Sequence, residues 1–220
     1  MNNKQESNLN IFFGSRKIKQ MNPIFNIERL IRFVERVNIL RLFEKIDISS
    51  HSNFLDLGCG QGHNSLVMSR HYDNVYGLDP SEAMVQFANK LKSVVFEKLK
   101  IGQNVVFKQG NFSNIPFDEQ FFDAIYLSNS IHFSLDISGD LDNILKYVKI
   151  SGYLVIKEPG SDPKFGSLEL NQPGEARNKK IAELKQASDR VKDYLSEKDG
   201  IEIFDQQEND NVFSIILKKN

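Results

Sequence analysis

Three glycines at alternate positions are the most distinctive chemical feature of this 220-residue sequence. Gly58, Gly60 and Gly62 stand in the run Asp56-Leu-Gly-Cys-Gly-Gln-Gly62, directly after a short apolar segment. Because glycine has no Cβ, such a loop can turn tightly and let a ligand approach its main-chain N–H groups. A helix is expected to begin at the end of this loop, and a helix N-terminus favours a phosphate or a carboxylate. The loop is therefore a candidate ligand-binding site.

Asp79 stands 21 residues after Gly58, at the end of the next expected strand. A carboxylate at this place is suited to bind the two hydroxyls of a ribose, so the loop and Asp79 together indicate a nucleoside-bearing cofactor. The spacing is G-x-G-x-G with His63 at the sixth position, which does not fit the dinucleotide fingerprint, and no Gly-Lys-Ser/Thr follows as in a P-loop. The alternative is a turn without a ligand, with Asp79 as a cap for the helix that starts near Ser81.

The elements that must position these residues alternate between short apolar runs and helical patterns. Strands are expected over 54–57, 75–78, 105–107, 122–127 and 153–156, and helices over 61–71, 81–100 and 138–149. This alternation indicates βαβ units and a parallel sheet with helices on both faces.

The end of the chain follows a different pattern. A charged helix over 174–198 precedes two more strand-like runs, 201–204 and 212–217, which are separated by only seven residues, Asp205 to Asn211. A parallel crossover needs a dozen or more residues, so this pair must form an antiparallel hairpin. The predicted fold is α/β, with a seven-stranded, mostly parallel sheet and a terminal antiparallel hairpin.

The first fifty residues carry no part of this pattern. Residues 1–20 are polar, whereas apolar residues recur every three or four positions over 26–46 and predict an amphipathic helix of about five turns. We divide the chain into 1–50, a flexible segment with a capping helix, and 51–220, the domain that contains the glycine loop. We hypothesise that residues 1–25 form a mobile lid; the alternative is a tail without a role.

Composition excludes several classes of protein. The 28 basic residues balance 29 acidic ones, and a net charge of −1 argues against nucleic acid as the main partner. The single cysteine cannot form an internal disulfide, and no Cys/His cluster has metal-ligand spacing. No apolar run approaches the ~20 residues that span a bilayer, and the polar start lacks a signal-peptide core. We expect a cytoplasmic protein without a metal; the sequence does not indicate an oligomeric state.

The glycine run resembles the first motif of class I S-adenosylmethionine-dependent methyltransferases. The likeness continues through Gly77-Leu-Asp-Pro-Ser-Glu-Ala-Met84, Gly110-Asn-Phe-Ser-Asn-Ile-Pro-Phe117, Phe121-Phe-Asp-Ala-Ile125 and Gly152-Tyr-Leu-Val-Ile-Lys-Glu-Pro-Gly160, and it covers about residues 53–160. These segments are similar to those of the small-molecule branch often called type 11 or UbiE-like. The resemblance implies a Rossmann-like fold, S-adenosylmethionine as the methyl donor and a small-molecule acceptor.

The same resemblance implies a set of cofactor-binding residues. Asp56 would contact the cofactor's amino group, the glycines would pass beside its methionine part, and Asp79 would bind its ribose. Asn111 stands where the family commonly has an acid; its amide can still bond to the adenine, while the neighbouring Phe112 would flank the ring. The full set is Asp56, Gly58, Cys59, Gly60, Gly62, Asp79, Pro80, Asn111, Phe112 and Ser128, the last of which would line the pocket under the sulfonium.

Two residues are candidates for catalysis. His132 follows the fourth strand and is interpreted as a base or a hydrogen-bond donor to the substrate, or as a histidine satisfied by neighbouring backbone. Glu158 ends the fifth strand and is interpreted as a base or as a carboxylate that orients an amine.

Two other functions stay open. The first is methylation of a protein or nucleic acid, against which stands the absence of an Asn-Pro-Pro-Tyr-like motif after the fourth strand. The second is a regulatory protein that binds the cofactor with little or no turnover, which Asn111 favours.

Overall fold

The computed structural model describes residues 39–47, 52–160, 174–209 and 212–220. The chain forms two compact units, of which the first ends at Asn111 and the second runs from Phe112 to Asn220. Each unit is a set of strands with the helices that connect or cover them.

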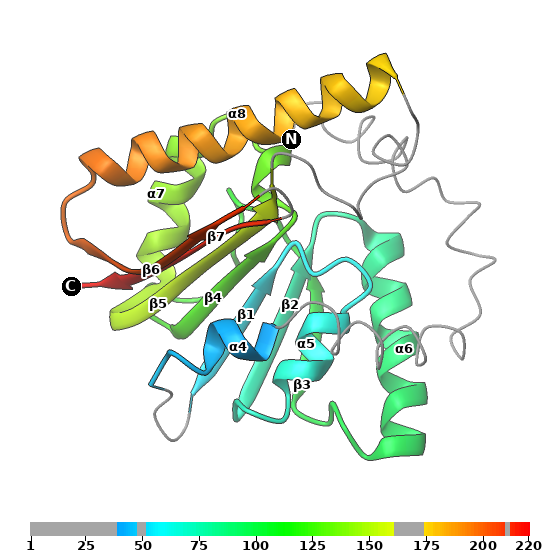
Figure 1. The fold of residues 1–220 in the computed structure, drawn as a ribbon. Helices are drawn as coiled ribbons and strands as arrows, with labels where there is room; N and C mark the ends of the chain where they lie inside the picture. Colours follow the sequence, from blue (N-terminus) through cyan, green and yellow to red (C-terminus); the bar gives the residue numbers. More distant parts are fainter. Residues whose placement is uncertain (1–38, 48–51, 161–173, 210–211) are drawn as a thin grey trace. The chain divides into compact units, whose positions relative to one another are not determined.

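The first unit contains three parallel strands in its described part. The strands are β1 (Asn53–Leu57), β2 (Asn74–Asp79) and β3 (Val105–Gln109), and the helices are α4 (Ile39–Phe43), α5 (His63–Met68) and α6 (Glu82–Leu99). β2 lies between β1 and β3 and pairs in parallel with both (Figure 1). Since a helix follows β1 and another follows β2, this unit is two successive βαβ crossovers, and the carboxyl ends of its strands lie at one edge.

α6 packs on the strands through a single apolar stripe. Its buried side chains recur at positions i, i+3, i+4, i+7 and i+11, and they are Met84, Phe87, Ala88, Leu91 and Val95. They face β2 and β3, as the period of an α-helix requires. The hydroxyl of Ser81 caps the start of α6 by accepting the N–H of Met84 at 3.4 Å. The expected helix start at Ser81 is therefore confirmed.

The second unit combines parallel and antiparallel pairing. Its elements are β4 (Phe122–Ser128), the 3₁₀-helix η1 (Ile131–Phe133), α7 (Ile137–Tyr147), β5 (Val148–Pro159), α8 (Glu175–Glu197), β6 (Ile201–Glu208) and β7 (Val212–Lys219). β4 and β5 are parallel, whereas β7 lies between β5 and β6 and runs antiparallel to both (Figure 1). The predicted terminal hairpin is confirmed, and the described chain has the predicted seven-stranded mixed sheet.

Three expectations differ from the structure or lie wholly or partly outside the described residues. The helix expected over 138–149 ends at Tyr147, because β5 begins at Val148, five residues before the run that the sequence indicated. Of the helix expected over 26–46, the structure describes only Ile39–Phe43 as helical, and residues 26–38 lie outside the described chain. The hypothesised lid, residues 1–25, also lies outside it.

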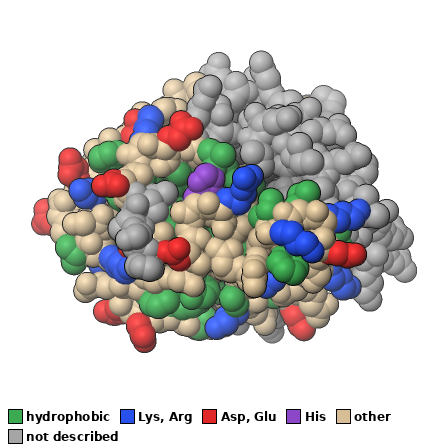
Figure 2. All heavy atoms as spheres, turned by 90° about the horizontal axis from the view of Figure 1, so that it is seen from below, with side chains coloured by type: hydrophobic (Ala, Val, Ile, Leu, Met, Phe, Trp, Pro, Cys, Tyr) green, Lys and Arg blue, Asp and Glu red, His purple; other side chains and the backbone are tan. Residues whose placement is uncertain are grey.

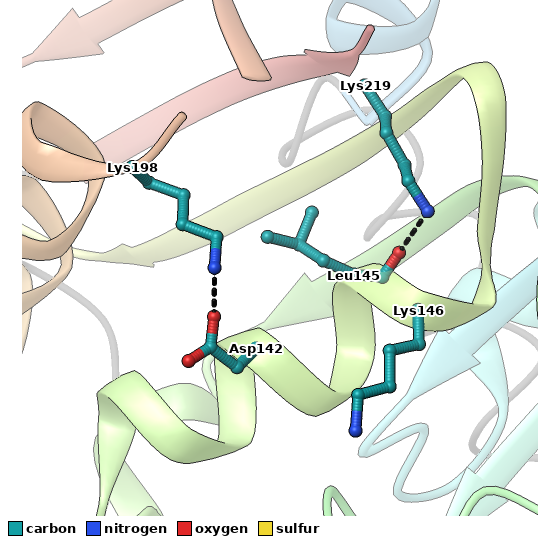
Figure 3. Close-up of a pocket in the computed structure, with 5 residues that line it drawn as sticks. All are labelled: Asp142, Leu145, Lys146, Lys198 and Lys219. Carbon is teal, nitrogen blue, oxygen red and sulfur yellow. Dashed lines mark hydrogen bonds and ion pairs between the residues drawn. The ribbon is translucent and has the colours of Figure 1, made fainter. Parts of the chain in front are cut away.

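A cavity of ≈ 490 Å³ lies at the C-terminal end of α7, and Figure 3 shows the five residues that line it: Asp142, Leu145, Lys146, Lys198 and Lys219. Nζ of Lys219 donates to the carbonyl oxygens of Leu145 at 2.8 Å and of Val148 at 2.9 Å. Lys198 forms an ion pair with Asp142. Lys219 thus stabilises the end of a helix, where carbonyl groups lack partners within the helix, whereas Lys198 contacts a side chain of α7. The residues predicted for the site are not among those that line this cavity.

Neither a membrane-spanning helix nor a metal-binding cluster occurs in the described ranges. No helix there is both long and apolar enough to cross a membrane. Within the same ranges, no group of three or more His, Cys, Asp or Glu side chains is placed to hold a metal ion.

Candidate functional site

The glycine loop connects the end of β1 to the start of α5. Gly58, Gly60 and Gly62 have φ values of 83°, 53° and 78°, in the left-handed region that glycine adopts readily. The N–H groups of Gly58 and Cys59 both donate to the carbonyl oxygen of Leu78, at 2.8 and 2.9 Å. These two bonds hold the loop against the end of β2, so the loop has a defined shape before any ligand binds.

Asp79 is the last residue of β2 and is joined to the loop by its side chain. One carboxylate oxygen accepts the N–H of Gly60 at 2.8 Å, and the other accepts the N–H of Ser81 at 2.9 Å. The residue is 8% exposed, and burial raises the pKa of its carboxyl, while the two N–H groups oppose that rise. Each oxygen can accept a second hydrogen bond. Asp79 therefore braces the loop, and its two oxygens keep the acceptor capacity that the predicted contact with a diol needs.

Asp56 lies in β1 and is fully buried. Its Oδ2 accepts hydrogen bonds from the backbone N–H of Ser65 at 3.1 Å and from the Ser65 hydroxyl at 2.7 Å. Its Oδ1 is buried and has no hydrogen-bond partner among the described residues. A buried acceptor without a partner is costly and uncommon, so Oδ1 marks a place where a donor from a ligand or a water fits.

Burial raises the pKa of Asp56 from its ordinary value of 3.8 to about 7, and the charge of Asp79 adds to the rise, against the two bonds from Ser65. The pKa of this carboxyl is higher in the folded than in the unfolded chain. Its contribution to the free energy of unfolding is therefore fully present below pH 3.8 and is lost as the pH rises through about 7. We expect the free energy of unfolding to fall by about 1–2 kcal/mol between pH 5.5 and 8.0 relative to an Asp56→Asn variant. Urea titrations at the two pH values measure this difference.

The matched control for this prediction is Asp118→Asn, because Asp118 is exposed. Its stability should follow that of the native protein at both pH values. If the native protein and the Asp56→Asn variant respond to pH in the same way, Asp56 ionises as an ordinary carboxyl and the prediction is wrong.

Cys59 lies within the loop and is 8% exposed. Burial, together with the charges of Asp56 and Asp79, raises the pKa of its thiol well above the ordinary value. A thiol in this environment stays protonated near neutral pH, so it is a poor nucleophile. Cys59 contributes a small side chain to the loop.

The remaining predicted cofactor residues occupy separate places. Pro80 follows β2 and is half-buried, and Asn111 is the half-buried last residue of the first unit. Phe112 begins the second unit, and its carbonyl oxygen accepts the side-chain N–H of Asn143 at 2.7 Å. Ser128 is the half-buried last residue of β4. The structure thus gathers Asp56, the glycine loop and Asp79 in the first unit, and it places Phe112 and Ser128 in the second.

His132 and Glu158 contact each other in the second unit. Nδ1 of His132 lies 2.5 Å from Oε2 of Glu158, and the two side chains are 7% and 1% exposed. The other oxygen, Oε1, accepts the backbone N–H groups of Ser130 at 2.8 Å and of Ile131 at 3.0 Å. His132 follows β4 and Glu158 lies near the end of β5, and because these strands are parallel the pair lies at the carboxyl edge of the sheet. The structure brings together the two residues that the sequence predicted as catalytic.

Three residues of these clusters carry no signal that sequence reasoning used. Ser65 bonds to Asp56 across nine residues, and the only hint is a serine inside a helical apolar pattern. Phe107 fills the space beside Gly62 and Gly77. Phe133 contacts the ring of His132 in a tilted arrangement with centroids 4.1 Å apart, and its position next to that histidine is the one hint in the sequence.

A family model for the methyltransferase domain matches residues 48–214 of the chain. The chain therefore belongs to the methyltransferase domain family, and the fold and the loop define it as a class I protein of that kind in the UbiE-like branch. The expected resemblance is confirmed. S-adenosylmethionine is the cofactor of this class.

Two curated relatives and one solved structure illustrate the match. The chain is 31% identical over 140 residues to demethylmenaquinone methyltransferase of Lactobacillus johnsonii, covering 60% of this chain and 50% of that protein. It is 24% identical over 158 residues to the uncharacterized methyltransferase YcgJ of Bacillus subtilis, covering 69% and 60%. It thus spans half to three fifths of the length of these two relatives. A SAM-dependent methyltransferase from Aquifex aeolicus matches with a TM-score of 0.64 at 16% identity, over 91% of this chain and all of that one, which shows a shared fold.

The residues of the first unit fit S-adenosylmethionine. The buried Oδ1 of Asp56 lacks a donor within the described chain, and Asp79 offers second lone pairs on two buried oxygens. At Gly60, an added Cβ would meet no described heavy atom within 4 Å, so the loop is open on that side. A cofactor with an amino group and a ribose diol supplies the donors that these carboxylates need.

Proposed function

We propose that the chain is an S-adenosylmethionine-dependent methyltransferase that acts on a small-molecule acceptor. The observation that carries the proposal is Asp79, a buried carboxylate whose two oxygens are fixed by Gly60 and Ser81 and can each accept another bond. A preorganised diol acceptor next to a left-handed glycine loop supports binding of a nucleoside cofactor over a purely structural turn.

Each part of the first unit has a separate task in this proposal. Asp79 binds the ribose hydroxyls, and Asp56 accepts a bond from the amino group. Asn111 bonds the adenine through its amide. When bound, the cofactor supplies a methyl group that its sulfonium already activates. The protein therefore mainly has to align the acceptor and exclude water, which can lower the barrier by several kcal/mol.

The case for a small-molecule acceptor rests on charge and on the relatives. The chain has a net charge of −1, and Figure 2 shows acidic and basic side chains both distributed over the described part of one face. Relatives that match the chain are named for small acceptors, among them demethylmenaquinone and, in wheat at 27% identity, phosphoethanolamine. Nucleic-acid-binding domains instead concentrate basic residues on one face.

A second candidate function is a regulatory protein that binds the cofactor with little turnover. Asn111 favours it, since an amide replaces the acid that is commoner in the family and removes one charge from the adenine pocket. Methylation of a protein or a nucleic acid is the third possibility, and a requirement for a macromolecular acceptor would identify it.

Calorimetry with S-adenosylhomocysteine and with NAD tests the cofactor, and conversion of S-adenosylmethionine to S-adenosylhomocysteine with a pool of metabolites tests the activity. We expect binding of S-adenosylhomocysteine, no binding of NAD, and turnover that depends on the metabolite pool. Binding without turnover supports the regulatory protein. Tight NAD binding with no response to S-adenosylhomocysteine contradicts the whole proposal.

A further inference from the structure

The contact between His132 and Glu158 joins the ends of two parallel strands in the second unit. Backbone hydrogen bonds fix the position of the Glu158 carboxylate independently of the histidine. Its Oε1 accepts the N–H groups of Ser130 and Ile131 at the start of η1. No side-chain cap is present at Ser130 itself. Glu158 therefore caps η1 from a neighbouring strand, and the same carboxylate has its second oxygen directed at Nδ1 of the histidine that η1 contains.

This geometry determines which nitrogen of His132 holds the proton. An ionised carboxylate only accepts hydrogen bonds, so a neutral imidazole 2.5 Å away must donate Nδ1–H to it. The lone pair then lies on Nε2, which has no hydrogen-bond partner within the described part of the chain. In hydrolases with a catalytic triad, a carboxylate bonded to Nδ1–H holds a histidine base in the same tautomer.

The groups around His132 include some that favour and one that disfavours a positive charge on its ring. The ring of Phe133 lies against it with centroids 4.1 Å apart and planes tilted by 40°, and an aromatic ring attracts a cation. Among the charged groups on elements packed against η1, Glu158 from β5 favours a positive ring. Lys180 from α8, whose ammonium lies 5.5 Å from the centroid of Phe133, opposes it from a greater distance than the Glu158 contact. Asp140 of α7 accepts a hydrogen bond from the hydroxyl of Ser134, two residues after His132.

We propose that Glu158 is a positioning residue that fixes the Nδ1-protonated form of His132, so that Nε2 takes the proton of a hydroxyl group on the methyl acceptor. The inference rests on the proposed function. The acceptor O–H bond breaks, the proton moves to Nε2, and the electron pair stays on the oxygen, which becomes the nucleophile. The result is an imidazolium paired with the Glu158 carboxylate, so the charge formed in the step is balanced where it forms.

The pair favours a hydroxyl acceptor over an amine or a thiol. A neutral amine attacks with its own lone pair, and its extra proton leaves only afterwards. A thiol, with an ordinary pKa near ~8.5, already ionises partly in water, whereas a phenolic hydroxyl near ~10 stays protonated. Only the hydroxyl needs a base during the attack, and a positioned base contributes roughly 10²–10⁴-fold to such a step. The acceptor class is therefore a phenol or an enol.

Nuclear magnetic resonance of the histidine ring nitrogens tests the positioning role without any acceptor. The chain has four histidines, and the signals that disappear in His132→Gln identify those of His132. At pH 8 we expect the native spectrum to show a protonated Nδ1 and a bare Nε2. In Glu158→Gln the amide keeps an oxygen for the N–H groups of Ser130 and Ile131 but can also donate to Nδ1, so the Nε2-protonated form should appear. An unchanged tautomer in Glu158→Gln overturns the proposal and leaves Glu158 as a cap of η1.

Turnover on phenol, aniline and thiophenol acceptors of matched shape tests the acceptor class. We expect methylation of the hydroxyl compound, with kcat lowered about 100-fold in His132→Gln and about tenfold in Glu158→Gln, while KM for S-adenosylmethionine stays within about twofold. His71→Gln, at an exposed histidine of the first unit, is the control and should keep the native kcat. Methylation of the amine or thiol but not of the hydroxyl overturns the proposal. Failure to bind S-adenosylhomocysteine instead contradicts the proposed function. The NMR experiment needs neither cofactor nor acceptor, so its result does not depend on that outcome.

Discussion

Replacing Gly62 by alanine should lower the free energy of unfolding by about 3 kcal/mol, because it combines backbone strain with overpacking. Gly62 has a φ of 78°, and a Cβ at this position would lie 2.4 Å from Cζ of Phe107 and 3.0 Å from Cβ of Ala88. Phe107 is 6% exposed on β3, and because buried side chains are closely packed, we expect it to yield only by displacing its neighbours. Urea unfolding of the two proteins measures the loss.

Gly60→Ala is the matched control for this prediction. Gly60 also has a positive φ, 53°, but an added Cβ would meet no described heavy atom within 4 Å. Alanine at this position should cost only the left-handed strain, about 1 kcal/mol. Phe107→Leu in the Gly62→Ala background should recover part of the larger loss, since it shortens the side chain that the new methyl group meets. Equal losses for Gly60→Ala and Gly62→Ala would show that the close approach of Phe107 has no energetic weight.

Much of the fold could be predicted because its signals are local or depend on chain length. The terminal hairpin follows from a connection too short for a parallel crossover, and the structure has β7 antiparallel to both of its neighbours. The early start of β5 could not be predicted in this way. Its pairing changes register between Phe122 and Ala124, where residues 149–152 add an irregular stretch with Ser151 at φ 63°. A run that contains a glycine and lacks alternation reads as a turn, although here it belongs to a strand.

The candidate site likewise contains residues that local spacing predicts and contacts that it does not. The distance of Asp79 from the glycine loop predicts its role, because one βα unit sets that distance. The contacts of Glu158 could not be predicted from the sequence. The backbone N–H groups that donate hydrogen bonds to it lie 27 and 28 residues away, at the start of η1. The partner of Asp56 is Ser65, which periodicity places on a buried helix face without indicating a hydrogen bond. Sequence spacing therefore predicts site residues that lie within one βα unit. Contacts between the ends of different strands can be predicted only when the fold is known.

Replacing Asp79 by alanine should weaken binding of S-adenosylhomocysteine by about 10- to 150-fold, which corresponds to about 1.5–3 kcal/mol. Two effects act together. The variant loses the charged acceptor for the ribose hydroxyls, and it also loses the bond that joins the carboxylate to the N–H of Gly60 at 2.8 Å. Calorimetric titration of the native and variant proteins with S-adenosylhomocysteine measures the change.

Two further variants separate the ligand contact from the support of the loop. Asp79→Asn keeps one oxygen for the Gly60 N–H but loses the charge and one acceptor, so its affinity should lie between those of the native protein and Asp79→Ala. Glu82→Gln removes a charge from the exposed first turn of α6, three residues along the chain, and should leave affinity within about twofold because exposed charges contribute little. Circular dichroism and urea unfolding establish that each variant is folded. A dissociation constant that is the same in folded Asp79→Ala as in the native protein would reduce Asp79 to a cap of α6 and a brace for the loop, and would remove the observation on which the proposed cofactor site depends.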